Sequence, residues 1–198
     1  MSSTKCSDFF ALIDCNNFFA SCEQVFNPRL ERKPLVILSN NDGVIISRSQ
    51  KAKEFGIKMG DPAFLHRQAV EKGELVMLSA NFSLYADLSQ RIMCLLQGTS
   101  SHLEIYSIDE AFLLLSRKKA WDQALSLKKH IKQCTGIPVS IGIGETKTLA
   151  KLSNANAKTE PNGIFLLSDP KARENILMKT SVQEIWGIGG KSSERLKR

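Results

Sequence analysis

Short apolar runs alternate along the chain with polar stretches that contain glycine, proline, asparagine or serine. Each run has the length and the β-branched or aromatic content that is typical of a strand. The first run stops at Asp14, too short for a signal-peptide core or a membrane span, so it is interpreted as a buried strand. Strands are predicted at Phe9–Ile13, Leu35–Leu38, Gly43–Ser47, Leu75–Leu78, Leu103–Ile108, Ala111–Ser116, Val139–Ile143 and Gly163–Leu167.

Between these runs, apolar residues recur at the three- to four-residue spacing of an amphipathic helix. Helices are predicted at Tyr85–Leu96, Lys119–Thr135 and Lys147–Ala157. The mixed order of strands and helices predicts an α+β fold, with a sheet that helices cover on one side.

The chain has 198 residues, enough for one good core or for two compact lobes. Hydrophobic residues make up 42% and charged residues 24%, without a low-complexity tract or a repeat, as in an ordinary soluble globular protein. The formal net charge of +7 favours a polyanionic partner without identifying it. Changes in composition near Pro28–Pro34 and Ser79–Ser83 bracket a predicted small inserted subdomain.

The five cysteines are scattered, odd in number and without a C-x-x-C pair. This pattern favours reduced thiols in a cytoplasmic protein over a disulfide framework or a structural zinc site. The histidines at 66, 102 and 130 lack metal-ligand spacing, and Gly142–Thr148 lacks the spacing of a phosphate-binding Walker loop. The cysteines are Cys6, Cys15, Cys22, Cys94 and Cys134.

Two adjacent carboxylates, Asp109 and Glu110, interrupt an apolar region in the sequence YSIDEAF. A buried ionised carboxylate is costly unless it is paired, protonated or bound to a metal. At the turn of a hairpin both could face one site, where Asp14 at the end of the first strand could join them. Three carboxylates suit a hard divalent cation such as Mg²⁺. The alternative is that Asp14 caps a helix and the other two decorate a turn.

A cationic stripe is predicted downstream of these acids. Lys147, Lys151 and Lys158 stand at i, i+4 and i+11, on one side of a helix. Such a stripe could supply positive charge to the site of the acidic residues, or it could be an ordinary solvated helix face.

Six segments taken together resemble the Y-family translesion DNA polymerases, of the UmuC type. Ordered matches across nearly the whole chain make the resemblance specific, whereas any one of them alone would not. The segments are Asp14–Glu23, Lys33–Gly43, Lys58–Pro62, Tyr106–Phe112, Thr146–Lys151 and Trp186–Gly189.

The resemblance implies a polymerase palm at residues 1–17 and 81–172, a fingers lobe at 18–80 and the start of a helical thumb at 173–198. The chain ends at Arg198, so the rest of the thumb and the little-finger domain are expected to be absent. Because these parts usually contribute contacts to the DNA duplex, weak and strongly salt-sensitive DNA binding is expected.

In the acidic site, the resemblance implies that Asp14, Asp109 and Glu110 hold two Mg²⁺ ions, with the carbonyl of Cys15 as a further ligand. One ion would activate the primer 3′-hydroxyl and the other would neutralise the leaving pyrophosphate.

The resemblance also implies a nucleotide site. The backbone amides of Asn17, Phe18 and Phe19, together with Lys158, would cradle the triphosphate. Phe19 would be the steric gate that excludes a ribose 2′-hydroxyl. A phenylalanine here also suits the core, and it could have both roles. In the fingers, where many relatives carry a Tyr-x-x-Arg pair, this chain has Gln50 and Lys53. Lys53 could supply charge to the phosphates without the two-pronged geometry of arginine.

The segment from Trp186 to Lys191 resembles the hairpin of a helix-hairpin-helix. Gly187, Gly189 and Lys191 would then contact a DNA phosphate without reading bases.

The resulting hypothesis is an error-prone, template-directed DNA polymerase core in DNA damage tolerance and SOS mutagenesis. Its partners would be primer-template DNA and deoxynucleoside triphosphates, with accessory polymerase subunits and a sliding clamp in the full-length protein, and no membrane. Two alternatives remain at this point. One is a truncated, non-catalytic fragment that binds DNA, nucleotide or polymerase partners, and the other is a cyclase-like palm.

Overall fold

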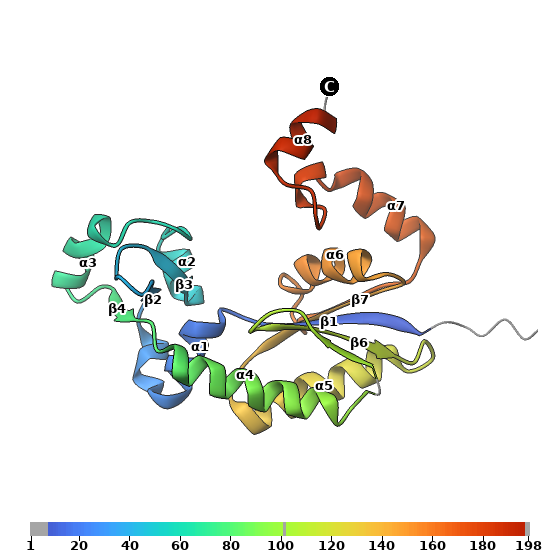
Figure 1. Ribbon diagram of the computed structural model, residues 1–198, viewed down its shortest axis with the longest axis horizontal. Coiled ribbons are helices and arrows are strands. Elements are labelled where there is room, and N and C mark those ends of the chain that lie inside the picture. The colour runs from blue at the N-terminus through green and yellow to red at the C-terminus, as the bar shows by residue number, and fades with distance from the viewer. Residues whose placement is uncertain (1–7, 101, 197–198) are drawn as a thin grey trace, which may run out of the picture. The chain divides into compact units, whose positions relative to one another are not determined.

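A computed structural model describes residues 8–100 and 102–196 of the chain (Figure 1). The chain divides into two compact units, each with its own sheet. The first unit comprises residues 1–14, 93–130 and 139–198, and the second comprises residues 15–92 and 131–138. Within the described residues, no helix has both the length and the apolar character needed to cross a membrane.

The first unit is built on a five-stranded mixed sheet. Its strands are β1 (Phe9–Cys15), β5 (Leu103–Ile105), β6 (Glu110–Leu115), β7 (Val139–Gly144) and β8 (Ile164–Leu167). The order across the sheet is β5-β6-β1-β7-β8. β6 pairs antiparallel with both β5 and β1, whereas β7 and β8 are parallel. A mixed sheet of this kind confirms the predicted α+β class.

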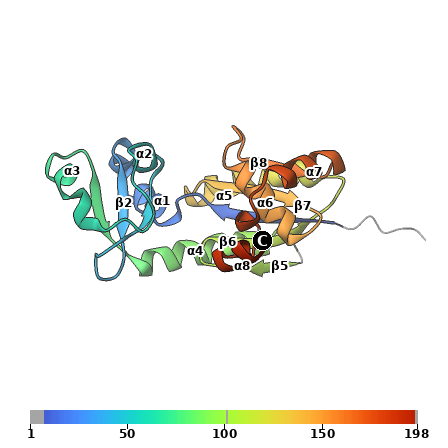
Figure 2. The ribbon, with the colours of Figure 1, turned by 90° about the horizontal axis from the view of Figure 1, so that it is seen from above.

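Helices lie on both faces of this sheet, so the prediction that only one side is covered was wrong. Helix α6 (Lys147–Ala157) lies over one face and α5 (Ala120–Thr135) lies under the other (Figures 1 and 2). Every residue of β1 from Ala11 onward is buried. A strand that is buried on both faces reads as a continuous apolar run, without the alternation expected of a one-sided sheet.

Helix α6 packs closely against β7. A Cβ atom on Gly142 would lie 2.1 Å from the backbone nitrogen of Asn154 and 2.3 Å from the carbonyl oxygen of Ala150, so the helix can approach only a glycine here. The buried side-chain amide of Asn154 donates hydrogen bonds to the carbonyl oxygens of Leu12 (3.2 Å) and Ser140 (3.0 Å). These contacts fix α6 against β1 and β7.

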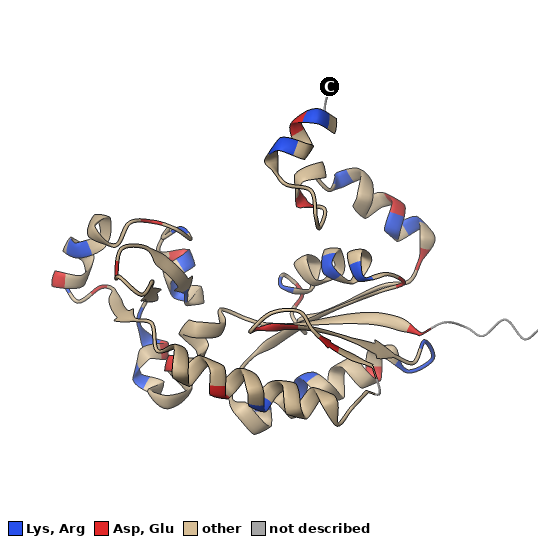
Figure 3. Ribbon diagram, viewed as in Figure 1, with Lys and Arg blue, Asp and Glu red and all other residues tan. Residues whose placement is uncertain are grey.

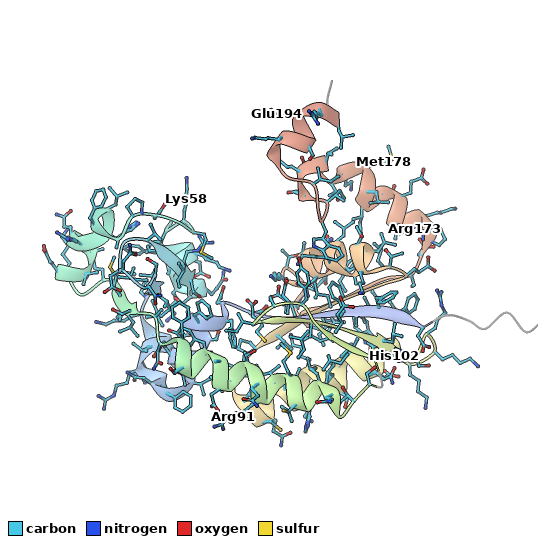
Figure 4. The ribbon with its side chains drawn as sticks, in the orientation of Figure 1. Lys58, Arg91, His102, Arg173, Met178 and Glu194 are labelled. Carbon is cyan, nitrogen blue, oxygen red and sulfur yellow. The ribbon has the colours of Figure 1, made fainter. Side chains whose placement is uncertain are left out.

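The C-terminal part of the first unit consists of α7 (Pro170–Lys179), a 3-10 turn at Val182–Glu184 and α8 (Gly190–Leu196). Glu145 ties α7 to the sheet, because it forms ion pairs of 2.8 Å with both Arg117 and Arg173. Figure 4 shows Arg173 on α7 and, farther along the same helix, Met178, which is 80% exposed.

The second unit has a three-stranded sheet in the order β3-β2-β4. β2 (Leu35–Leu38) is antiparallel to β3 (Ile45–Arg48) and parallel to β4 (Val76–Ser79). Its core contains Val36, Leu38, Ile45, Ala52, Ile57 and Leu75. The helices that begin in this unit are α1 (Phe18–Phe26), α2 (Gln50–Glu54), α3 (Arg67–Glu71) and α4 (Phe82–Gln97), with 3-10 segments at Pro28–Arg32 and Ala63–His66.

All eight predicted strands and all three predicted helices are confirmed, several of them with shifted ends. The helices α1, α2, α3, α7 and α8 were not located by helical spacing, although the resemblance implied a helical segment at residues 173–198. They are short, and α1 lacks a side-chain cap, since Asn17 before it adopts a left-handed conformation (φ 51°). Cys15, Cys22, Cys94 and Cys134 form no disulfide in the described part of the chain, and Cys6 lies outside it.

Candidate active site

The ends of β1 and β6 bring two of the predicted acidic residues together in the first unit. Asp14 and Glu110 are direct cross-strand partners in the antiparallel ladder. Residues in this relation lie on the same face of a sheet with their Cβ atoms about 5 Å apart. Asp109 precedes Glu110 in the turn from β5. We call Asp14, Asp109 and Glu110 the acidic edge.

Ser107 organises the turn that carries Asp109. Its hydroxyl oxygen accepts hydrogen bonds from the backbone amides of Asp109 (3.3 Å) and Glu110 (3.0 Å), and the hydroxyl donates to a carboxylate oxygen of Asp109 (2.8 Å). The amides of Tyr106 and Ser107 both donate to the carbonyl oxygen of Glu110. Because this turn closes on Glu110, β5 ends at Ile105 and does not reach Ile108 as predicted.

The predicted lysine stripe faces acidic side chains of the sheet. Lys158, the residue that caps α6, pairs with Asp14 at 2.8 Å. Lys151 contacts both carboxylate oxygens of Glu110, at 3.1 and 2.8 Å. Lys147, one helical turn earlier, pairs with Glu104 of β5. In Figure 3 the basic segments of α6 lie above the acidic segments of the sheet. The lysines are therefore not a simple solvated face, and the cations expected beside the acids are supplied at least in part by the chain itself.

Burial dominates the electrostatics of Asp14. Its residue exposure is only 7%. Burial raises the pKa of Asp14 to about 6, although the Lys158 ammonium opposes this rise by its charge and its hydrogen bond. Glu110 and Asp109 also raise the pKa of Asp14, which places all three carboxylates within electrostatic reach of one another. Additional positive charge at this edge would favour the ionised form of Asp14.

The donor chemistry of the acidic edge fits a hard divalent ion, because all three side chains offer carboxylate oxygens. Within residues 8–100 and 102–196, however, no three His, Cys, Asp or Glu side chains are gathered closely enough to hold a metal ion. The carboxylates of Asp14 and Glu110 are engaged by lysines instead. Cys15 follows Asp14 in β1 with its side chain buried.

The residues predicted to hold a nucleotide are divided between the units. Lys158 belongs to the first unit, whereas Asn17, Phe18, Phe19 and Lys53 belong to the second. Phe18 is buried and begins α1, which leaves Asn17 as the residue before the helix. Lys53 lies exposed on α2.

Phe19 belongs to a group of rings in the second unit that we call the aromatic cluster. It stacks on Tyr85 with ring centroids 4.5 Å apart and planes inclined by 13°. Phe82 contacts both rings edge-on, at 5.9 and 6.0 Å. Tyr85 is fully buried, and its hydroxyl donates a 2.8 Å hydrogen bond to Glu23. Phe19 itself stays partly exposed, so its ring is fixed on one side and accessible on another.

The predicted DNA-contacting residues lie at the start of α8. Gly187 has a φ of 88°, in the left-handed region that favours glycine, and a Cβ on Gly187 or Gly189 would meet no atom within 4 Å. Lys191 is exposed in the first turn of the helix.

The contact between this segment and the acidic turn was not predicted from the sequence. The indole nitrogen of Trp186 donates a 3.0 Å hydrogen bond to the hydroxyl of Tyr106, and the indole ring packs on Tyr106 and Phe112. The residues are 80 positions apart along the chain, and no spacing rule connects them. The role of Ser107 could have been inferred from the tendency of serine to bind nearby backbone amides.

Comparison with known proteins places this arrangement in a family. The family model described as impB/mucB/samB matches residues 13–155. Protein UmuC of Salmonella typhimurium is 40% identical over an alignment of 194 residues, and the match covers 94% of this chain and 46% of UmuC. Protein MucB of Escherichia coli is 39% identical over an alignment of 196 residues, and the match again covers 94% of this chain and 46% of the relative. The chain thus spans about half the length of these relatives.

The fold comparison agrees with the sequence comparison. The solved structure of an insertion ternary complex of Dbh DNA polymerase has a TM-score of 0.82 and 30% sequence identity to this chain. The match covers 96% of this chain and 57% of that structure. The resemblance to Y-family polymerases of the UmuC type is confirmed, and the chain belongs to the impB/mucB/samB family.

Proposed function

We propose that the chain is the core of a template-directed DNA polymerase of the error-prone translesion type, acting in DNA damage tolerance and SOS mutagenesis. The observation that carries this proposal is the pairing of Asp14 with Glu110 across β1 and β6, beside Asp109 in the turn. Its support from relatives is the similarity to UmuC and to a DNA polymerase captured as an insertion ternary complex.

The acidic edge would hold two Mg²⁺ ions, with the carbonyl of Cys15 as a further ligand. When bound there, the ions supply the Lewis acidity of two-metal phosphoryl transfer, at the primer hydroxyl and at the leaving pyrophosphate. The chain contributes the position of the carboxylates. Asp14 and Glu110 are set by strand register and Asp109 by its bond to Ser107.

The second unit would bind the deoxynucleoside triphosphate. Backbone amides of Asn17, Phe18 and Phe19 at the start of α1 can donate to phosphate oxygens, and Lys53 would add charge, as would Lys158 from the first unit. Phe19 would act as the steric gate against ribonucleotides. The stack of Phe19 on Tyr85 supports this role, because a fixed ring excludes a hydroxyl more effectively than a mobile one.

Primer-template DNA would lie against Gly187, Gly189 and Lys191, whose backbone amides and charge suit a phosphate. The corresponding division is a palm at residues 1–17 and 81–172, fingers at 18–80 and thumb at 173–198. Accessory subunits and a sliding clamp are proposed as partners of the full-length protein, with a cytoplasmic location.

The two alternatives are not favoured. A non-catalytic binding fragment would not need all three carboxylates of the acidic edge. A cyclase-like palm would not need the ring at position 19 or the glycine-rich segment before α8.

Primer extension in Mg²⁺, on undamaged and abasic templates, tests the proposal. We expect Asp109→Asn to lower the extension rate by about 10³-fold, since lost transition-state charge stabilisation at one position costs roughly 10²–10³ in rate. Glu104→Gln is the matched control, because Glu104 lies on the same hairpin and is paired with Lys147 outside the acidic edge. If the chain extends no primer and Asp109→Asn behaves identically, the enzymatic proposal fails.

A further inference from the structure

The ammonium group of Lys151 lies between the acidic edge and two aromatic rings. On one side it contacts both carboxylate oxygens of Glu110, at 3.1 and 2.8 Å. On the other side it lies 4.6 Å from the ring centroid of Tyr106 and 5.9 Å from that of Trp186. A cation in such a position is attracted by the ring faces as well as by the carboxylate. Lys151 is therefore held from two directions.

Lys147 offers an internal comparison on the same helix. It also pairs with a carboxylate of the β5–β6 hairpin, Glu104, and it also lies near aromatic rings. The side chains of the Lys147–Glu104 pair are 33% and 55% exposed, whereas those of Lys151 and Glu110 are 28% and 17% exposed. The more enclosed pair is Lys151–Glu110, the one that includes a residue of the acidic edge.

The rings beside Lys151 join the acidic turn to the C-terminal segment. Trp186 donates its indole hydrogen to the hydroxyl of Tyr106 and packs against Phe112, in a cluster with Leu12 of β1. Tyr106 begins the turn that carries Asp109. A change in the position of Lys151 would thus alter the surroundings both of Glu110 and of Trp186, which precedes α8.

We propose that Lys151 is a positioning residue of the acidic edge. Its ammonium group is the counter-ion of Glu110 and is displaced when a divalent cation binds there. This displacement changes the packing environment of Trp186. The proposal rests on the proposed function, in which Glu110 is a metal ligand.

The exchange follows from the contacts. Lys151 engages both oxygens of Glu110, so a dication bound to the same oxygens must compete with it. The ammonium and the dication would also repel each other at such short range. Displacement of the ammonium removes positive charge from the faces of Tyr106 and Trp186. Divalent-ion binding and the environment of Trp186 should therefore change together.

Two readouts test the exchange without depending on catalysis. Mn²⁺ binding is measured from the electron paramagnetic resonance signal of the free ion. Trp186 emission is followed during Mg²⁺ titration in a Trp121→Phe background, which leaves Trp186 as the one tryptophan of the sequence. The variants are Lys151→Met, Lys151→Arg and, as matched control, Lys147→Met. Circular dichroism melting confirms that each variant is folded.

We expect Lys151→Met to bind Mn²⁺ on the order of fivefold more tightly, because a competing ion pair of ordinary strength is removed. Its Trp186 emission should no longer respond to Mg²⁺. Lys151→Arg should retain a wild-type-like affinity and response, and Lys147→Met should change neither by more than about twofold. Unchanged or weaker Mn²⁺ binding by Lys151→Met, or a persisting emission response, overturns the inference.

Glu110→Gln distinguishes a failure of the exchange alone from a failure of the proposed metal site. If the wild-type chain binds Mn²⁺ and Glu110→Gln abolishes this binding while Lys151→Met has no effect, only the exchange fails. If the wild-type chain has no Mn²⁺ binding that depends on Glu110, the metal site of the proposed function fails together with the exchange.

Discussion

The acidic edge of the first unit and the aromatic cluster of the second are held in place by different forces. At the acidic edge, carboxylates are paired with lysines at 2.8 Å, and one of them is buried enough for its pKa to rise to about 6. In the aromatic cluster, three rings, one of them a buried tyrosine, pack at centroid distances of 4.5 to 6.0 Å. Charge pairing responds to ions and salt, whereas ring packing does not.

This difference matches the roles proposed for the two regions. A site that must accept and release ions benefits from counter-ions that can be exchanged. A site that must exclude a hydroxyl group by shape benefits from a rigid wall. Substitutions in one region should therefore disturb it while leaving the other intact.

The largest effect is expected where α6 carries its lysines over the sheet. Gly142→Ala would place a Cβ 2.1 Å from the backbone of α6, and backbone atoms cannot move aside as the end of a side chain can. We expect the free energy of unfolding to fall by about 3 kcal/mol or more, by comparison with the upper range of overpacking costs. Chemical denaturation measures this change. Gly189→Ala is the control, because its Cβ would meet nothing within 4 Å; equal losses in both variants would contradict the close packing of α6.

The next effect concerns the aromatic cluster. Phe19→Ala should raise incorporation of ribonucleotides relative to deoxynucleotides by on the order of 10²-fold, the scale on which shape alone discriminates substrates. Single-nucleotide insertion assays measure the ratio. Phe82→Leu alters a neighbouring ring of the same cluster and should leave the ratio nearly unchanged. A similar loss of discrimination in both variants would assign selectivity to the cluster as a whole and not to Phe19.

A smaller effect is expected from removing one counter-ion. Lys158→Met leaves the buried carboxylate of Asp14 without its 2.8 Å partner. The expected loss of stability is about 1–2 kcal/mol, below the cost at a fully buried pair because the Lys158 side chain is 48% exposed.

Salt distinguishes the charge pair from the ring packing. The loss caused by Lys158→Met should shrink in 1 M NaCl, where charges are screened within about 3 Å. Tyr85→Phe, which removes the hydrogen bond to Glu23 in the aromatic cluster, should cost about 1 kcal/mol with little salt dependence. Equal salt dependence of the two losses would contradict the contrast between the regions.

The smallest effect is a pH dependence at Glu145, away from both regions. Hydrogen bonding to Arg117, followed by the Arg117 charge and the contact with Arg173, lowers the pKa of Glu145 below its ordinary value of 4.5. A carboxyl group whose pKa is lowered by folding stabilises the protein above its unfolded pKa and loses this contribution as pH falls through the folded value. The side chains of Glu145, Arg117 and Arg173 are about one-third exposed, so the expected contribution to the free energy of unfolding is about 1 kcal/mol or less.

Thermal melts of wild type and Glu145→Gln at pH 7 and pH 3 measure this contribution. The wild type should be the more stable of the two at pH 7, and the difference should shrink as the pH is lowered to 3. A difference that grows as the pH falls would show that the sign of the linkage is wrong.

Much of the fold was predictable because the strands and the longer helices correspond to local patterns of apolar residues. Short apolar runs located all eight strands of the described residues, and the helical spacing within Lys147–Ala157 located α6 with its correct ends. The placement of Asp14 and Asp109–Glu110 at the ends of two strands was also enough to predict that they would approach each other. Coverage of both sheet faces was missed, although the unbroken apolar run of β1 indicated it.

The contacts that complete the site could not be predicted in the same way. The hydrogen bonds from Asn154 to two strands and the contact of Trp186 with Tyr106 join residues far apart in sequence. Such contacts depend on the packing of α6 and of the C-terminal segment on the sheet, not on local spacing. The lysine spacing predicted a stripe, but only the structure assigns each lysine to a particular carboxylate.

The most direct test of the account is to locate a divalent ion in crystals of the chain grown with Mn²⁺, by anomalous diffraction. We predict an anomalous peak from an ion that is bonded to carboxylate oxygens of Asp14, Asp109 and Glu110, at roughly the 2.0–2.1 Å expected for a small divalent ion, with Lys151 no longer bonded to Glu110. Mn²⁺ bound only elsewhere, with the Lys151–Glu110 and Lys158–Asp14 pairs intact, would contradict the assignment of this edge as the metal site.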